Sequence, residues 1–251
     1  MINFLHIPKC GGSTVRDYLR KYFKKIRNNE EKTISLRSIF VYGKTGKMGD
    51  LNIGNFRDES LDEFYGRGGD GICGIVGHYK YDSLALFLGN NNTYGNTFTL
   101  VRDPIDRMIS NVNYLKLNVN HRAHKRAADL NQRNIVDYLI NAAKTRNAGS
   151  FQCNFLGANI DVARKVDASY LVENVFIKIN IYKIESTLLA INNHLLYIRP
   201  GFNLDKKNIT PQARINSEDN ELIHKNMIAN DRLAEIKQLY SNDYVLYGMA
   251  L

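Results

Sequence analysis

A chain of 251 residues, 44% hydrophobic and 24% charged, has the length and composition of one large globular domain, which argues against a disordered or low-complexity protein. Its formal net charge of +9 favours anionic partners. The widely spaced cysteines, Cys10, Cys73 and Cys153, form neither a C-x-x-C pair nor a zinc pattern, so we expect reduced thiols and no metal site.

The first apolar run, residues 2–7, is far shorter than the ~20 residues of a membrane-spanning helix. It leads straight into a glycine turn, which fits neither a signal peptide nor an anchor. We therefore expect a cytoplasmic protein without a membrane span.

The apolar run ends at Pro8, and residues 9–14 follow with the sequence KCGGST. Apolar residues at 15, 19, 22, 23 and 26 then have the spacing of one buried helix face, with Ser13 or Thr14 as the expected cap. A strand, a glycine turn and a helix N-terminus predict an anion-binding loop. A Walker A loop has its lysine directly before the hydroxyl residues, whereas here Lys9 precedes the glycines. A plain turn with a helix cap is the alternative.

Residues 39–42 form the next strand candidate, and residues 43–71 follow with eight of the chain's 18 glycines. This long excursion either covers a substrate or is a surface insertion, and both interpretations stay open. Residues 72–77 predict a buried strand that ends at His78. An imidazole there is a candidate general base, although a structural histidine is the commoner role.

A short helix is expected over residues 82–88, and a strand over 97–101 leads into Arg102 and Asp103. Asp103 is the expected N-cap of a helix with Pro104 in its first turn. Apolar residues at 105, 109, 112 and 115 give this helix one buried side, and Arg102 and Ser110 fall outside that stripe.

Further helices are predicted over residues 134–144, 150–156, 186–196 and about 217–240, with a strand of one exposed face near an edge at 175–182 and a loop at 201–214. His6 is expected to be buried and hydrogen-bonded, and His121 and His124 to face solvent. The alternation of strands and helices predicts a single α/β domain over residues 1–251, with a central, mainly parallel sheet flanked by helices. Ligands bind such sheets beyond the carboxyl ends of the strands, where Lys9, His78 and Arg102 fall.

Two segments, residues 4–14 (FLHIPKCGGST) and 100–110 (LVRDPIDRMIS), resemble the cofactor motifs of sulfotransferases, in the subgroup that contains the carbohydrate sulfotransferases. The likeness is to the heparan sulfate 2-O-sulfotransferase type, supported by VGHY at 76–79 and FQCNFLG at 151–157. The resemblance covers almost the whole chain and implies a P-loop NTPase-like fold.

The resemblance also implies 3'-phosphoadenosine 5'-phosphosulfate as the donor, adenosine 3',5'-bisphosphate as the product, and no metal. The 5'-phosphosulfate would bind the loop residues Cys10, Gly11, Gly12, Ser13 and Thr14. Lys9 would bind the donor and stabilise the leaving oxygen, and His78 would be the general base.

The same resemblance implies a 3'-phosphate site made by Arg102 and Ser110. Arg107 either assists there or pairs with Asp103 or Asp106. A later basic loop supplies weaker cofactor candidates, for which a solvated loop is an equal alternative: Lys206, Lys207 and Thr210.

We therefore expect in-line transfer of a sulfuryl group to a hydroxyl group of a sugar. Because the protein carries a net positive charge, an acidic sugar would also be a suitable acceptor. One alternative is a P-loop-like ATP-dependent kinase, against which the place of Lys9 argues. Another is a non-catalytic basic nucleic-acid-binding module, favoured by the charge and 15 tyrosines but lacking any RNP, KH or zinc-finger pattern. We expect no specific nucleic-acid partner.

Overall fold

The computed structural model describes residues 2–26, 33–36, 39–43, 72–78, 97–146, 148–156, 179–194 and 222–251. Within these ranges a six-stranded sheet has the order β2-β3-β4-β1-β5-β6. Its parallel strands are β4 (Ile72–Gly77), β1 (Ile2–Leu5), β5 (Thr97–Val101) and β6 (Asn180–Lys183). At the other edge β2 (Thr33–Leu36) and β3 (Ile39–Gly43) run antiparallel to their neighbours. The predicted α/β architecture with a mainly parallel sheet is confirmed.

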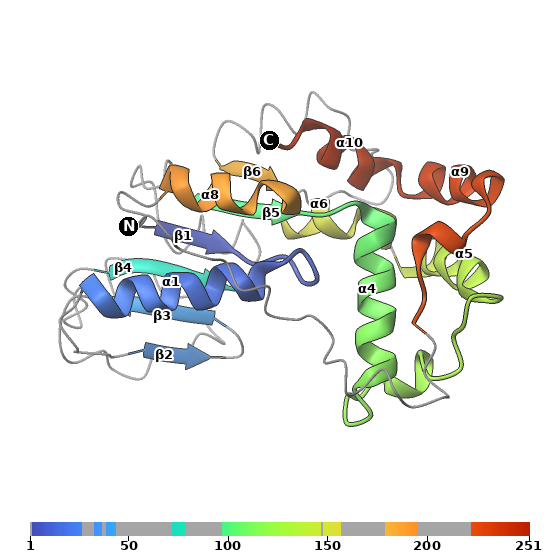
Figure 1. Cartoon of the computed structure of the whole chain (residues 1–251), viewed down its shortest axis with the longest axis horizontal. Helices are drawn as coiled ribbons and strands as arrows, with labels where there is room; N and C mark the ends of the chain where they lie inside the picture. The colour runs from blue at the N-terminus through green and yellow to red at the C-terminus, as the bar shows by residue number, and fades with distance from the viewer. Residues whose placement is uncertain are drawn as a thin grey trace.

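Helices α1 (Gly12–Ile26) and α8 (Thr187–His194) cover one face of this sheet (Figure 1). Val15 and Leu19 of the predicted α1 stripe are buried. The predicted cap of α1 is wrong, because the helix begins at Gly12 and places Ser13 and Thr14 inside its first turn. The helix instead follows a backbone turn at Gly11, whose φ is +76°.

A helical half of the molecule extends from the end of β5 (Figure 1). It consists of α4 (Pro104–Leu117), α5 (Ile135–Arg146), α6 (Phe151–Phe155), α9 (Asn230–Leu239) and α10 (Ser241–Met249), with short 3-10 turns at His124–Arg126, Ala148–Ser150 and Lys225–Met227. Its apolar core includes the whole predicted α4 stripe: Ile105, Ile109, Val112 and Leu115. Asp103 caps α4 as predicted, since its carboxylate accepts the N–H groups of Ile105 and Asp106, both at 3.0 Å.

The helix predicted over about residues 217–240 is confirmed at its end, since α9 ends at Leu239 with Tyr240 as its cap, but its start is wrong, because α9 begins only at Asn230. A 3-10 turn precedes α9, and the chain turns at Tyr240 before α10 begins. Tyr240 is buried, and its hydroxyl donates to the Leu139 carbonyl at 3.1 Å. Because the chain turns here, α10 packs beside α6 while α9 packs on α5.

The strand predicted over residues 175–182 is described as β6 from Asn180 onward, and it does lie at an edge of the sheet. Its expected exposed face is not found, because the neighbours Ile181 and Tyr182, which point to opposite faces, are both buried. The outer backbone groups of the strand are also covered. The N–H of Leu251 donates to the Ile181 carbonyl at 2.9 Å, and the Lys183 N–H donates to the Leu251 carbonyl at 2.7 Å.

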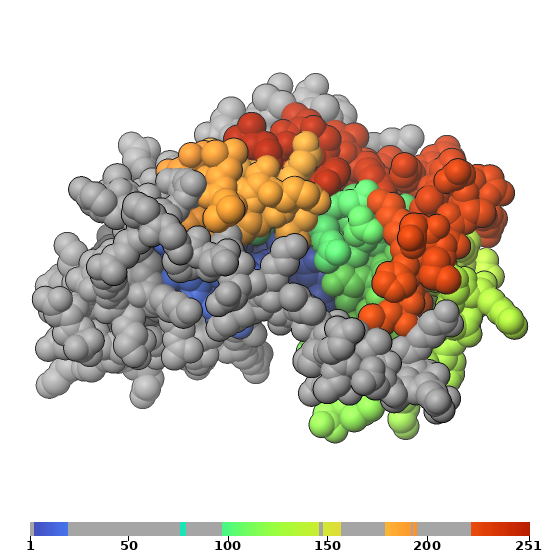
Figure 2. All heavy atoms as spheres, viewed as in Figure 1, coloured from blue at the N-terminus to red at the C-terminus, as the bar shows by residue number. Residues whose placement is uncertain are grey.

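Figure 2 shows the N-terminal residues, the first part of α4 and the C-terminal helices meeting in the middle of one face. No helix in the described ranges is long and apolar enough to cross a membrane. The predicted elements and residues at 44–71, 82–88, 175–178 and 201–214, which include Lys206, Lys207 and Thr210, lie outside the described residues.

Candidate functional site

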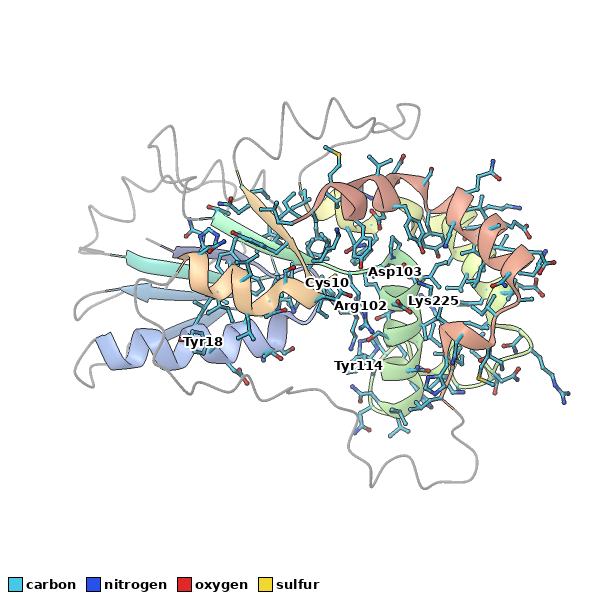
Figure 3. The ribbon with its side chains drawn as sticks, turned by 45° about the horizontal axis from the view of Figure 1, so that its top comes forward. Cys10, Tyr18, Arg102, Asp103, Tyr114 and Lys225 are labelled. Carbon is cyan, nitrogen blue, oxygen red and sulfur yellow. The ribbon has the colours of Figure 1, made fainter. Side chains whose placement is uncertain are left out.

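The candidate site lies where three neighbouring parallel strands end. Lys9 belongs to the loop after β1, His78 directly follows β4, and Arg102 directly follows β5. The sequence-based prediction that these residues share the carboxyl edge of the sheet is confirmed, and Figure 3 shows Cys10 and Arg102 close together where the sheet meets α4. This edge is the usual ligand position in an open α/β sheet.

The loop after β1 directs backbone donors outward. Lys9 and Gly11 both have left-handed backbones, with φ of +69° and +76°. Such a conformation costs a lysine about 1–2 kcal/mol, and backbone strain of this kind gathers at functional sites. The N–H of Cys10 is taken by the Ile7 carbonyl, but those of Gly11, Gly12 and Ser13 have no acceptor in the part of the chain that the structure describes. Donors of this kind at the start of a helix are the feature that anion-binding loops share.

The loop packs directly on the ring of His6. A Cβ on Gly12 would lie 1.9 Å from the His6 Cδ2, so no larger residue fits there. His6 is 4% exposed, as predicted, but its Nδ1 has no hydrogen-bond partner among the described residues. Burial lowers the pKa of His6 to about 2, and electrostatic interactions with His78, Arg16 and Lys9 add to the effect. His6 is therefore a neutral ring beneath the loop.

His78 is held by the same residue. Its ring stacks on that of His6 with centroids 4.1 Å apart, and its Nδ1–H donates to the His6 carbonyl at 2.7 Å. Because a carbonyl can only accept, this hydrogen bond leaves the lone pair of neutral His78 on Nε2. Burial lowers the pKa of His78, with Arg16 and Lys9 adding to the effect and the bond to His6 opposing it. The lowered pKa favours the neutral imidazole of His78, with its lone pair on Nε2.

Lys9 rests on an aromatic ring that the sequence analysis missed. Its Nζ lies 3.3 Å from the ring centroid of Tyr114, which is 42% exposed on α4. Burial, followed by the charge of Arg102, lowers the pKa of Lys9 to about 8. Ser110 stands one helical turn before Tyr114, so it shares the side of α4 that faces the loop. No contact between Ser110 and Arg102 is found in the described part of the chain.

The backbone of Arg102 is gripped by a second residue that the sequence analysis did not single out. The Arg102 N–H donates to Oε1 of Gln152 at 2.9 Å, and Nε2–H of Gln152 donates to the Arg102 carbonyl at 2.8 Å. The thiol of Cys10 donates to the same Oε1 at 3.3 Å. Gln152 belongs to the 151–157 segment that supported the family resemblance, which is the one signal that marked it. Its carboxamide joins the loop to the end of β5.

The carboxylates near Arg102 are occupied by residues of the C-terminal segment. Lys225 places its Nζ 2.7 Å from Asp103 and 3.4 Å from Asp106 (Figure 3). The hydroxyl of Tyr244 also donates to Asp103, at 3.1 Å. The Arg102 guanidinium, in contrast, has one partner within the described ranges, the Lys9 carbonyl at 3.5 Å. Most of its N–H donors therefore have no acceptor among the described residues.

The predicted pairing of Arg107 with Asp103 or Asp106 is wrong. Arg107 is 2% exposed, and its guanidinium carbon lies 3.9 Å from the ring centroid of Phe151. Its position on α4 turns it into the helical core, whereas Asp103 and Asp106 face Lys225.

The surroundings of His121, His124 and Cys10 can be compared with the predictions from the sequence. His121 and His124 do not face solvent freely, because His124 bonds the Leu115 carbonyl through Nδ1 at 2.8 Å and His121 accepts the Ala123 N–H at 3.1 Å. The thiol of Cys10 is buried, and burial raises its pKa to about 12. Cys10 is therefore a neutral thiol whose contacts serve the loop.

The chain matches no known protein family, no curated protein and no solved structure. In the described ranges there is also no group of three or more His, Cys, Asp or Glu residues arranged to hold a metal ion.

Proposed function

We propose that the chain is a sulfotransferase with a P-loop NTPase-like fold, which moves a sulfuryl group from 3'-phosphoadenosine 5'-phosphosulfate to a hydroxyl, on a sugar. One observation carries the proposal. The glycine-loop amides that have no acceptor among the described residues lie at the ends of three adjacent parallel strands, together with the ammonium of Lys9, the guanidinium of Arg102 and the neutral His78. An anion site and a free base side by side are what sulfuryl transfer to a hydroxyl needs.

The residues fit a ligand with phosphate groups at both ends. The N–H groups of Gly11, Gly12 and Ser13 suit the 5'-phosphosulfate, and the hydroxyls of Ser13 and Thr14 lie in the same helical turn. Arg102 offers a planar fork for the 3'-phosphate. The nearest carboxylate, Asp103, is engaged by Lys225, so it does not repel that phosphate at full strength.

The chemistry that this donor supplies is a sulfuryl group on a phosphate leaving group. Nε2 of His78 takes the proton of the incoming hydroxyl, so that its oxygen becomes nucleophilic as it attacks sulfur. Lys9 carries its ammonium at neutral pH and stabilises the negative charge that grows on the departing phosphate oxygen. The loop amides hold the same charge without reorganising, because the backbone fixes them.

Isothermal titration of the purified chain tests the proposal against its alternatives. We expect adenosine 3',5'-bisphosphate to bind without magnesium and more tightly than ATP with magnesium. A preference for ATP with magnesium would instead support a kinase. Salt-sensitive binding of DNA of any sequence, with no binding of the bisphosphate, would support the nucleic-acid-binding module.

The acceptor is then identified by a transfer assay. The donor is offered together with neutral and acidic oligosaccharides, small alcohols and phenols, and sulfated products are measured by mass spectrometry. We expect a sugar hydroxyl to be modified. If only a phenol were sulfated, the proposed reaction would stand, but the proposed sugar acceptor would be wrong.

A further inference from the structure

The side chain of Gln152 continues the hydrogen-bonding pattern of the sheet beyond the end of β5. The ladder between β5 and β6 ends at Val101, and at the next residue both backbone groups of Arg102 are bonded by the single carboxamide of Gln152. The two bonds, at 2.9 and 2.8 Å, run in opposite directions, as those of a paired strand residue do. The direction of the chain at Arg102 is therefore set by Gln152.

The same carboxamide also reaches the glycine loop. Its Oε1 accepts the Cys10 thiol at 3.3 Å, one residue after Lys9 and one before Gly11. A second link runs directly between the two segments, from the Arg102 Nη1–H to the Lys9 carbonyl at 3.5 Å. The loop and the end of β5 are thus connected through Gln152.

The backbone of Gln152 is itself held by Asp243. Asp243 of α10 accepts the Gln152 N–H with both oxygens at 3.0 Å and the Cys153 N–H at 3.0 Å. Gln152, Cys153 and Asp243 are all fully buried. These buried hydrogen bonds fix the backbone position from which the Gln152 side chain extends, because a broken bond would leave an unpaired polar group away from water.

We propose that Gln152 is a positioning residue that sets the spacing between the glycine loop and Arg102, and so between the two phosphate sites of one nucleotide. This inference rests on the proposed function. A ligand with two phosphates gains affinity only if both sites are held at the right separation, since the second contact then forms at a high effective concentration. A ligand with one phosphate does not need that separation.

The test compares three ligands by isothermal titration: adenosine 3',5'-bisphosphate, adenosine 5'-monophosphate and adenosine 3'-monophosphate. The variant is Gln152→Met, which has a similar length but makes none of the carboxamide bonds. We expect bisphosphate binding to weaken at least tenfold, and binding of either monophosphate to weaken less than threefold. The matched control is Gln132→Met, because among the described residues its side chain hydrogen-bonds only the backbone of His224, near the surface, and there we expect no change.

A second variant keeps the test decisive if Gln152→Met does not fold. In Gln152→Glu the ionised carboxyl accepts but cannot donate to the Arg102 carbonyl, whereas the protonated carboxyl can do both. We expect its bisphosphate affinity, relative to the unchanged chain at the same pH, to recover as the pH falls from 8 to 6.

The outcomes separate the two proposals. If the unchanged chain does not bind the bisphosphate, the proposed function fails and this inference fails with it. If the unchanged chain binds but the Gln152 variants bind equally well, only the role of Gln152 is refuted. An equal loss of affinity for all three ligands would show general loosening of the core and would also refute a role in spacing.

Discussion

The two parts of the candidate site that we propose to bind phosphate groups are built in different ways. The loop of residues 8–14 is shaped by its own backbone, through the left-handed Lys9 and Gly11 and the immediate start of α1. Arg102 is held by contacts from far along the chain. Gln152 lies 50 residues away in sequence, and the Asp243 that holds Gln152 lies 91 residues further on.

This difference predicts which substitutions should disrupt each part. A loop formed by local turns depends on a few backbone conformations, so single substitutions within it should be severe. The Arg102 part depends on the helical half being assembled, so substitutions and pH changes far from the site should reach it. Five predictions test this contrast.

We expect the largest effect from Gly12→Ala. A Cβ there would lie 1.9 Å from His6, so either the loop or the His6 ring must move, and overpacking of this kind costs about 3 kcal/mol or more. Because His6 also holds His78, nucleotide binding and turnover should both be lost. Urea unfolding and titration of the bisphosphate measure the two effects. The matched control is Gly248→Ala in α10, where a Cβ meets no atom within 4 Å and stability should hold or rise slightly. Equal behaviour of the two variants would contradict the packing argument.

The next largest effect is expected for His78→Ala, which removes the base and leaves the phosphate donors intact. Turnover should fall by about 10²–10⁴, the usual contribution of a general base, with bisphosphate affinity nearly unchanged. Initial rates in the transfer assay and titration of the same samples measure both quantities. His224→Ala, at an exposed position, serves as the control. Full turnover in the His78 variant would remove it as the base.

Arg102→Ala should act on binding alone. Gln152 grips the backbone of Arg102, so the substitution leaves that clamp in place while it deletes the guanidinium. Bisphosphate binding should weaken by about 1.5–3 kcal/mol, the scale of a charged hydrogen bond. Thermal unfolding should change little, and the exposed Arg133→Ala should change neither quantity. Wild-type affinity in the Arg102 variant would refute the 3'-phosphate assignment.

Asp243 should make the stability of the Arg102 part depend on pH. Burial raises the pKa of Asp243 from 3.8 to about 6, although Arg107 and its hydrogen bonds oppose the shift. A carboxyl with a raised pKa contributes stability that is complete below its unfolded pKa and is lost as the pH rises through about 6. Relative to Asp243→Asn, the unchanged chain should therefore lose about 2 kcal/mol of unfolding free energy between pH 4 and pH 7. Urea titrations across this range measure the difference, and parallel curves would exclude the effect.

The smallest expected effect is proton uptake by Lys9 when the nucleotide binds. Lys9 has its pKa lowered to about 8, so near pH 8.5 part of its population is neutral. An anion bound beside it favours the charged form and raises its pKa, so nucleotide binding should take up a fraction of a proton. Titrations in buffers of different ionisation enthalpy measure this uptake. It should be absent in Lys9→Arg, since a guanidinium stays charged at this pH. Equal uptake in both would assign the proton to another group.

Much of the fold could be predicted because its signals are local. The strands at the starts of both motifs, the stripe of α4 and the capping by Asp103 follow from periodicity and cap chemistry within a few residues. The second C-terminal helix, α10, and the buried second face of β6 could not be predicted in this way. Both depend on contacts with other elements: α10 packs beside α6, and His194 of α8 contacts the ring of Tyr182.

The sequence by itself determined the glycine loop, the start of α4 and the placement of Lys9, His78 and Arg102 at strand ends, since short-range geometry and parallel pairing decide these features. Only the tertiary structure decided which residues support them. The fit of Gly12 on His6, the ring of Tyr114 under Lys9 and the grip of Gln152 on Arg102 join residues that are remote in sequence. Such contacts depend on how the strands and helices are assembled, and no pattern of residue types along the chain encodes them separately.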